Sequence, residues 1–236
     1  MKILAIETSS RAGSAALMEE DRLIGESYLD GGLTHSQTAL PMAQQVLRLA
    51  GTAWREVDAF AVSVGPGSFT GLRIGIATVK GLADAQEKPC YGISTLEGLA
   101  WNLAGFAGWI CPVLDARCGQ IYTALFYGDG ERVLRRGEDL AMAAAQRLEE
   151  LCALEGPIWL VGDGAKLCYD GWKSRLPGLR LAPAALRQQR ASSLAAAALA
   201  GAAAPVPADQ LAPVYLRRPQ AERERLAKLQ QEGAEL

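Results

Sequence analysis

The sequence predicts an α/β protein built from two small lobes. With 236 residues, the chain lies between one average domain of ~150 residues and two such domains. Hydrophobic residues make up 50% and charged residues 21%, which is ordinary for a globular protein and excludes disorder of the whole chain. Apolar runs of strand length alternate with helical patterns, and the same order of elements recurs loosely in the second half.

The first half has the pattern of one complete lobe. An apolar run at 2–7 predicts a strand, and apolar segments on either side of a polar turn at 19–22 predict a hairpin over 14–29. The elements expected next are a helix near 36–50, a buried strand at 58–64, a helix at about 70–85, a strand at 90–94, and a third helix opened by the capping box Ser94-x-x-Glu97. Three strands in hairpin-like succession, followed by helix, strand and helix, match a ribonuclease-H-like lobe.

The second half predicts a looser version of this lobe. The expected elements are strands at 109–115 and 119–127, a helix at 138–154, a strand at 157–161 and an Ala-rich helix at 191–204. Two such lobes in tandem form an actin-like (ASKHA) fold, which sugar kinases share. We therefore expect an N-terminal lobe at 1–105, a smaller C-terminal lobe at 106–215 and a charged helical tail at 216–236.

Charge and composition exclude several classes of protein. A net charge of −2 argues against a strongly basic nucleic-acid-binding surface. From the acidic residue after the short apolar run at 2–6 we expect no signal peptide, and the sequence has no apolar stretch of the ~18 residues that a membrane helix needs. Five cysteines without CxxC spacing predict reduced, mostly buried thiols in a cytoplasmic protein, with zinc ligation a distant alternative. His35 is the single histidine, which excludes any metal site or proton relay that requires two.

The helices at 37–50 and 70–85 are too apolar for ordinary surface helices. On a helical wheel, the apolar arc of the first spans roughly 180°, whereas one packing surface needs ~100°. The second has only a narrow polar strip and several glycines, each about 1 kcal/mol less favourable than alanine. One explanation is that both helices lie beneath the second lobe. The other is that the sheet covers one face of each helix and another subunit covers the opposite face. The repeated glycines favour the second explanation. The residues predicted for this partner interface are Leu40, Met42, Ala43, Val46, Leu47, Leu72, Gly75, Ile76 and Val79.

Three turns are weak candidates for binding a nucleotide or another anion. The turn after the first strand stands where actin-like ATPases grip phosphates, but it carries Glu7 in place of an aspartate and lacks a glycine. The Gly-Pro-Gly-Ser block at 65–68 predicts a tight turn with Ser68 or Thr70 capping the next helix, and no Walker lysine follows it. An ordinary structural turn is the better explanation for the turn after the first strand, and it explains the other two sites equally well. The candidate residues are Glu7, Thr8, Ser9, Gly65, Gly67, Ser68, Gly162, Asp163 and Gly164.

The sequence contains no recognisable catalytic constellation. No nucleophile elbow occurs, and no cysteine has a histidine placed beside it by sequence logic. His35 precedes a helix, so we expect it to be a capping or interface residue instead of a base. We expect no catalytic residue and no metal site.

Several short motifs can be compared with known families. They are Ile6-Glu7-Thr8-Ser9, His35-Ser36, Leu40-Pro41-Met42, the block Gly65–Gly75, Asp115-Ala116-Arg117, Gly162-Asp163-Gly164 and Pro213–Arg217. Together they resemble the TsaB family of bacterial tRNA threonylcarbamoyladenosine biosynthesis proteins. The glycine-proline block followed by Thr-Gly-Leu-Arg-Ile-Gly is the most specific of these motifs.

The resemblance implies a two-lobed actin-like fold and a non-catalytic scaffold with no intrinsic cofactor. Its partner would be TsaD, which has a similar fold and a metal-binding His-x-x-x-His motif. TsaD transfers the threonylcarbamoyl group to N6 of the adenosine beside the anticodon in tRNAs that read codons beginning with A. A chain with one histidine cannot contain the TsaD motif. The resemblance also implies a heterodimer with TsaD through the two over-apolar helices, and a homodimer through them when TsaD is absent.

Further partners follow from the same resemblance. TsaE, an ATPase, would join the assembly, ATP or ADP would bind at the interface of the complex, and tRNA would be reached only through the complex. Two other functions stay open. A glycoprotease-like metallopeptidase needs metal ligands that the sequence does not supply, and Glu7 with the missing glycine argues against an autonomous actin-like ATPase.

Overall fold

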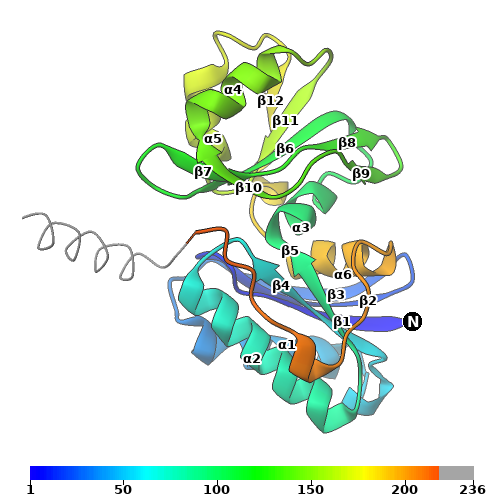
Figure 1. Cartoon of the computed structure of the whole chain (residues 1–236). Coiled ribbons are helices and arrows are strands. Elements are labelled where there is room, and N and C mark those ends of the chain that lie inside the picture. The colour runs from blue at the N-terminus through cyan, green and yellow to red at the C-terminus, as the bar shows by residue number, and fades with distance from the viewer. Residues whose placement is uncertain (218–236) are drawn as a thin grey trace, which may run out of the picture.

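The computed structural model describes residues 1–217, which form two lobes, each built on one β-sheet (Figure 1). In the first lobe, five strands form one sheet; along the sheet their order is β3 (Arg22–Leu29), β2 (Gly13–Glu19), β1 (Lys2–Glu7), β4 (Ala59–Gly65) and β5 (Cys90–Ser94). The helices packed on them are α1 (His35–Leu49), α2 (Phe69–Gln86), α3 (Thr95–Trp101) and α6 (Ala191–Leu199). The elements predicted for the first half are confirmed.

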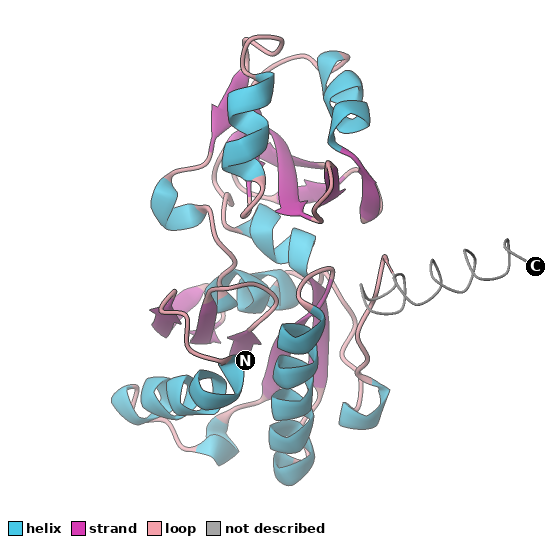
Figure 2. Ribbon diagram, turned by 90° about the vertical axis from the view of Figure 1, so that its left-hand side faces the viewer, coloured by secondary structure: helices cyan, strands magenta, loops and turns pink. Residues whose placement is uncertain are grey.

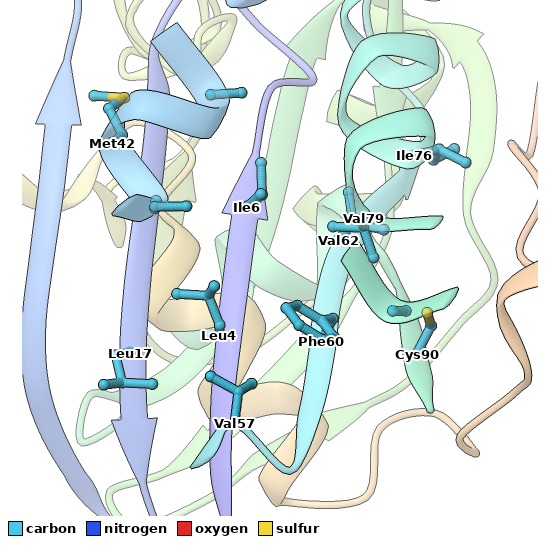
Figure 3. Packing of buried hydrophobic residues seen from close by; sticks show 14 of the residues in the cluster. Leu4, Ile6, Leu17, Met42, Val57, Phe60, Val62, Ile76, Val79 and Cys90 are labelled. Carbon is cyan, nitrogen blue, oxygen red and sulfur yellow. The ribbon is translucent and has the colours of Figure 1, made fainter. Parts of the chain in front are cut away.

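Strand β1 lies at the centre of the first sheet and is buried on both faces. It pairs antiparallel with β2 and parallel with β4. Its side chains alternate: Leu4 and Ile6 pack with α1 and α2, whereas Ile3 and Ala5 pack with α6. Figure 3 shows the first of these clusters, around Phe60, and Figure 2 shows helices on both faces of the sheet. Each face therefore has its own helical layer.

The second lobe is built on the strand order β10-β7-β6-β11-β12, with β8 paired to β6 and β9 paired to β8. The long strand β6 (Ala107–Asp115) pairs with β8 along its first half and with β7 along its second half. The other elements are β7 (Gln120–Thr123), β8 (Phe126–Asp129), β9 (Val133–Arg135), β10 (Leu140–Ala143), α4 (Ala144–Cys152), β11 (Ile158–Val161), α5 (Ala165–Trp172) and β12 (Leu179–Leu181). Helices α4 and α5 cover one face, and α3 packs against the other, between the two sheets (Figure 1).

Two predicted elements of the second half are wrong. The single strand expected at 119–127 is divided into β7 and β8, because the chain passes from one half of β6 to the other at Ala124 and Leu125. The helix expected at 138–154 begins only at Ala144, because the residues before it pair with β7 as strand β10. Tertiary pairing thus overrides a helical pattern there. Strands β9 and β12 and helix α5 were not predicted.

The boundary expected for the second lobe is wrong at its C-terminal end. Helix α6 packs on β1 and β2 of the first sheet, where Ala191 N donates to Ser14 Oγ at 2.9 Å. Val214 N then donates to Val64 O at 2.7 Å, so the segment after α6 also runs along the first lobe. The chain therefore returns to the first lobe before residue 191. The charged helical tail predicted for 216–236 lies outside the described residues from 218 onward.

Serine side chains begin two of the helices as expected. Ser94 Oγ accepts from the backbone N of Leu96 and Glu97, and Ser68 Oγ accepts from Gly71 N at 3.2 Å. Glu97 pairs with Arg135 at 2.8 Å instead of closing the predicted capping box. Among residues 1–217, no helix has the length and apolar character needed to cross a membrane.

Candidate functional site between the lobes

A polar cleft of about 570 Å³ separates the two lobes. Its walls come from the β1–β2 turn, the N-terminus of α2, the turns after β6 and β11, the connection before α6, and the C-terminal segment that follows it. The lining residues are Ser9–Arg11, Pro66–Thr70, Leu114–Arg117, Tyr122, Asp163, Gln189 and Val214–Arg217.

The first wall is the junction of the β1–β2 turn with the N-terminus of α2. Ser68 N donates to Ser9 O at 2.7 Å. A Cβ on Gly67 would lie 2.6 Å from Ser9 O, and a Cβ on Gly71 would lie 2.1 Å from Thr8 O. These two glycines therefore allow α2 to approach the end of β1 directly. Among the candidates in the two turns, Ser9, Gly67 and Ser68 line the cleft.

Glu7 and Thr8 are directed away from the cleft, into the first lobe. The Glu7 side chain is buried, and its Oε1 accepts from Ser63 Oγ at 3.0 Å. Burial raises the pKa of the Glu7 carboxyl above its ordinary value, although hydrogen bonds from Ser9 and Ser63 oppose the shift. Thr8 Oγ1 donates to Gly71 O at 2.8 Å. A carboxylate held in this way does not reach a magnesium ion in the cleft.

The second wall consists of two linked turns of the C-terminal lobe. Asp115 N donates to Asp163 Oδ1 at 3.0 Å, and Arg117 N donates to Asp115 Oδ1 at 2.7 Å. Burial raises the pKa of the Asp163 carboxyl, while the hydrogen bond from Asp115 N opposes the shift. A Cβ on Gly162 would meet Val113 O, and a Cβ on Gly164 would meet Asp115 N. These glycines therefore pack inside the lobe, and of the predicted triplet only Asp163 lines the cleft.

The third wall is the segment 211–217, which we call the strap. Gly65 has φ +126°, and a Cβ there would lie 2.3 Å from Val214 O. Gly65 is therefore covered by the strap and does not line the cleft. Beyond it, Arg217 Nη1 donates to Ala116 O at 2.9 Å on the second wall. The strap thus connects both lobes across the cleft.

An aromatic stack fixes the strap to the start of α2. The rings of Phe69 and Tyr215 stack with their centroids 4.9 Å apart. The Arg73 guanidinium lies 3.8 Å from the Phe69 centroid, and its Nε donates to the Tyr215 hydroxyl at 3.1 Å.

Gln189 is a lining residue that the sequence did not indicate. It lies in the connection between β12 and α6 and is 2% exposed, and its side-chain Nε2 and Oε1 have no hydrogen-bond partner. Ser9 Oγ is also buried without a partner. No motif marks Gln189, the second of two adjacent glutamines between Arg187 and Arg190, so only its place in the fold singles it out.

The residues predicted for the partner interface are mostly buried inside the chain. Leu40 is 39% exposed, but the other eight are buried: Met42, Ala43, Val46, Leu47, Leu72, Gly75, Ile76 and Val79. Helix α1 packs on β2, β3 and α2, and α2 packs on β4, so the sheet and the neighbouring helix cover most of the apolar arcs. Gly75 faces Thr8, whose Oγ1 would lie 2.3 Å from a Cβ. The prediction that these eight residues form a partner interface is therefore wrong, because they belong to the core of the chain.

The outward sides of α1 and α2 expose a different set of residues. Leu40 and Gln44 are exposed on α1, and Arg73, Ala77 and Gly81 are exposed at successive turns of α2. A Cβ on Gly81 would meet no atom within 4 Å. We call these five residues the outward face of the helix pair.

His35 and the cysteines have structural positions. His35 begins α1, and its Nε2 lies 2.6 Å from Ser10 O, so the ring holds the β1–β2 turn. In the described part of the chain, no three His, Cys, Asp or Glu side chains gather as a metal site. The buried thiols are those of Cys90, Cys111 and Cys168, and the exposed thiols are those of Cys118 and Cys152.

Comparison with known proteins supports this arrangement of lobes and cleft. A family model described as "TsaD: tRNA N6-adenosine threonylcarbamoyltransferase" matches residues 32–224. A Bacillus subtilis protein named tRNA threonylcarbamoyladenosine biosynthesis protein TsaB is 37% identical over 170 residues, covering 71% of this chain and 73% of that protein. YeaZ from Pseudomonas aeruginosa is 30% identical, with a TM-score of 0.71 over 91% of this chain and 100% of its own. Component A of (R)-2-hydroxyglutaryl-CoA dehydratase from Acidaminococcus fermentans shares the fold, with a TM-score of 0.50 at 11% identity over 85% of this chain and 97% of its own.

Two ribonuclease-H-like lobes around a polar cleft define an actin-like protein, which confirms the predicted fold class. Within that class, the match over residues 32–224 and the identity with the Bacillus subtilis relative decide the family. The chain belongs to the TsaB family.

Proposed function

We propose that this chain acts in tRNA threonylcarbamoyladenosine biosynthesis as a non-catalytic subunit that binds TsaD and activates it. The observation that carries the proposal is the match to the TsaD family model over residues 32–224 in a chain with a single histidine. That histidine contacts a backbone carbonyl of its own lobe. The chain therefore shares the framework of a transferase without a pair of histidines to bind a metal.

The first wall of the cleft supports the non-catalytic role. An actin-like ATPase requires a carboxylate that faces the phosphates, and here the Glu7 carboxylate bonds Ser63 inside the lobe. Gly67 packs on Ser9 and Gly71 on Thr8, so the start of α2 lies directly against the turn after β1. The residues of this turn do not fit a magnesium nucleotide, and we assign no hydrolytic step to them.

The outward face of the helix pair is the surface we assign to TsaD. It combines an exposed leucine, a pair of small residues at i and i+4 on α2, and one arginine, which suits close packing of two helices from a partner. A second copy of this chain would occupy the same face when TsaD is absent. The family resemblance alone adds TsaE to the assembly, ATP or ADP at its interface, and tRNA contact through the complex.

Reconstitution of tRNA threonylcarbamoylation tests the proposed role. In this family's pathway, TsaC makes the threonylcarbamoyl-adenylate whose threonylcarbamoyl group TsaD transfers. Purified TsaC, TsaD and TsaE are supplied with threonine, bicarbonate, ATP and unmodified tRNA, with and without this chain. We expect modification to depend on the chain, and equal modification in its absence would contradict the scaffold role. The isolated chain with tRNA and threonylcarbamoyl-adenylate is expected to give no product. Product formed there would contradict the non-catalytic assignment.

Two variants test the outward face. Leu40→Asp and Ala77→Arg each place a charge where a partner helix would pack, so we expect the affinity for TsaD to fall about 100-fold. Leu167→Asp is the matched control, since Leu167 is 72% exposed on α5 of the other lobe. Calorimetric titration with TsaD measures the affinity, and thermal unfolding checks that each variant is folded. Wild-type affinity in both folded variants would exclude this face as the TsaD site.

A further inference from the structure

The Arg73 side chain belongs both to the outward face of the helix pair and to the contact that holds the strap. Its guanidinium lies 3.8 Å from the Phe69 centroid, and its Nε donates to the Tyr215 hydroxyl at 3.1 Å. Within residues 1–217, the structure gives Nη1 and Nη2 of Arg73 no hydrogen bond and no ion pair. Because the side chain is exposed, these two nitrogens are available to an acceptor on a partner.

The strap itself has few anchors. Residues 211–217 form no helix or strand, and Val214 and Tyr215 are 51% and 38% exposed. The anchors are the buried side chain of Leu211, the bond from Val214 N to β4, the contacts of Tyr215 with α2, and the bond from Arg217 to the second lobe. A segment with so few buried contacts opens locally more easily than a packed strand or helix. The strap therefore has two arrangements, docked on α2 or released from it.

The far end of the strap contacts a strained turn of the second lobe, the β6–β7 turn at residues 116–119. Arg217 Nη1 donates to Ala116 O at 2.9 Å. The three residues after Ala116 all have positive φ: Arg117 (+63°), Cys118 (+54°) and Gly119 (+70°). This backbone conformation is unfavourable for residues other than glycine, so it persists only where surrounding contacts fix it. The hydrogen bond from Arg217 is one of these contacts.

We propose that the strap couples the outward face of the helix pair to the β6–β7 turn, and that Arg73 is the residue through which a partner acts. A carboxylate of the partner fits the two unused nitrogens of Arg73, since a guanidinium binds a carboxylate through two parallel N–H bonds. Such a pair fixes the guanidinium against Phe69 and Tyr215, and so favours the docked strap and the strained turn. The coupling stands on contacts within this chain, and the identification of the partner as TsaD rests on the proposed function.

Amide hydrogen exchange of the full chain without a partner tests the coupling. Arg73→Met keeps an unbranched side chain on α2 but removes the guanidinium. We expect exchange at Val214 N to rise about fivefold, the factor that one hydrogen bond of ordinary strength represents. Gln120 N, which donates to Arg117 O at 3.1 Å and closes the β6–β7 turn, should exchange about two- to threefold faster.

Lys80→Met is the matched control on the same helix. Lys80 Nζ donates to Asp209 O at 3.1 Å, so this variant also removes a charge and a contact with the C-terminal segment, but outside the strap. Its exchange at Gln120 N should equal wild type, and unchanged exchange at Ile158 N on β11 shows that a variant is folded. If Arg73→Met disturbs α2, Tyr215→Phe makes the same test, because it removes only the hydroxyl that accepts from Arg73. Wild-type exchange at Gln120 N in the folded variant, or an equal rise in Lys80→Met, would overturn the coupling.

Calorimetric titration with TsaD tests the role of the partner. Coupling between two sites is reciprocal, so releasing the far end of the strap must weaken binding at α2. We expect Arg73→Met to raise the dissociation constant about tenfold and Arg217→Met about threefold, whereas the double variant should stay near tenfold. An unchanged constant in Arg73→Met would exclude the carboxylate contact, and a double variant that loses the full product, about thirtyfold, would overturn the coupling. If the wild-type chain does not bind TsaD, the proposed function fails, and the exchange measurement decides the coupling independently.

Discussion

Replacing Gly71 with alanine tests how closely α2 packs on the end of β1. A Cβ at this position would lie 2.1 Å from Thr8 O, and the same residue accepts a hydrogen bond from Thr8 Oγ1 at 2.8 Å. Contacts of a real Cβ below 3.0 Å are essentially never seen, so helix and strand would have to separate by about 1 Å. Because β1 is buried on both faces, the strand has no free direction in which to move.

The expected loss follows from three contributions. Overpacking against a backbone carbonyl in a rigid core lies near the upper end of its usual range, about 3 kcal/mol. Loss of the Thr8–Gly71 hydrogen bond adds about 1 kcal/mol. Alanine regains about 1 kcal/mol of helix propensity relative to glycine. Gly71→Ala should therefore lower the free energy of unfolding by about 3 kcal/mol.

Gly81→Ala is the matched control on the same helix. A Cβ on Gly81 would meet nothing within 4 Å, so only the propensity gain of about 1 kcal/mol applies, and this variant should be more stable than wild type. Urea unfolding of the three proteins at one temperature measures both effects. The reasoning is wrong if Gly71→Ala unfolds within about 0.5 kcal/mol of wild type, or if Gly81→Ala is the less stable of the two variants.

Three further predictions concern the buried carboxyl, an ion-pair network and the strap. Burial raises the folded-state pKa of Glu7 above the ordinary 4.5, so the wild type should lose stability as pH rises from 4.5 through that raised value. Glu7→Gln should lack this decline. Urea unfolding of both proteins at pH 4 and pH 7 measures the difference, and an equal loss of unfolding free energy in both proteins would contradict the prediction. Arg135→Met removes the ion-pair partner of Glu97, whose side chain is 10% exposed, and should lower the free energy of unfolding by about 2 kcal/mol. The loss is smaller than for a fully buried pair because the Arg135 side chain is 35% exposed. An unchanged urea midpoint would show that the pair contributes nothing. Tyr215→Ala removes the stack on Phe69 and should speed hydrogen exchange at Val214 N, whereas exchange at the wild-type rate would mean that the strap is held by its backbone alone.

Local patterns were sufficient to predict the first lobe but not all of the second. An apolar run marks strand β1 and a serine cap marks the start of helix α2, and both signals lie within the element itself. The division of 119–127 has no such signal, since neither Ala124 nor Leu125 favours a break. It arises because β6 is long enough to pair with two strands in turn. The placement of α6 on the first sheet likewise depends on a chain return that no local pattern encodes.

The candidate site shows the same limit. The turn residues Ser9, Gly67 and Ser68 could be predicted because strand ends and helix starts mark the edge of an α/β sheet. Gln189 could not, because its significance comes from being buried without a partner, and burial is a property of the assembled lobes. The role of the strap residue Tyr215 could not be predicted either, because it comes from stacking on Phe69, 146 positions earlier in the chain.

The glycines of α2 show why an apolar helix is an ambiguous signal for a partner. Glycine costs helix stability wherever it occurs, so its repeated use must be offset by some close approach. At Gly71 and Gly75 the approaching group is Thr8 of the same chain, and at Gly81 no atom of the chain approaches. Only Gly81 leaves the penalty without an internal explanation. The case for a partner on α2 therefore rests on Gly81 and the exposed turns around it. A substitution at Gly81 leaves the packing of the chain itself unchanged, so it can separate partner binding from folding.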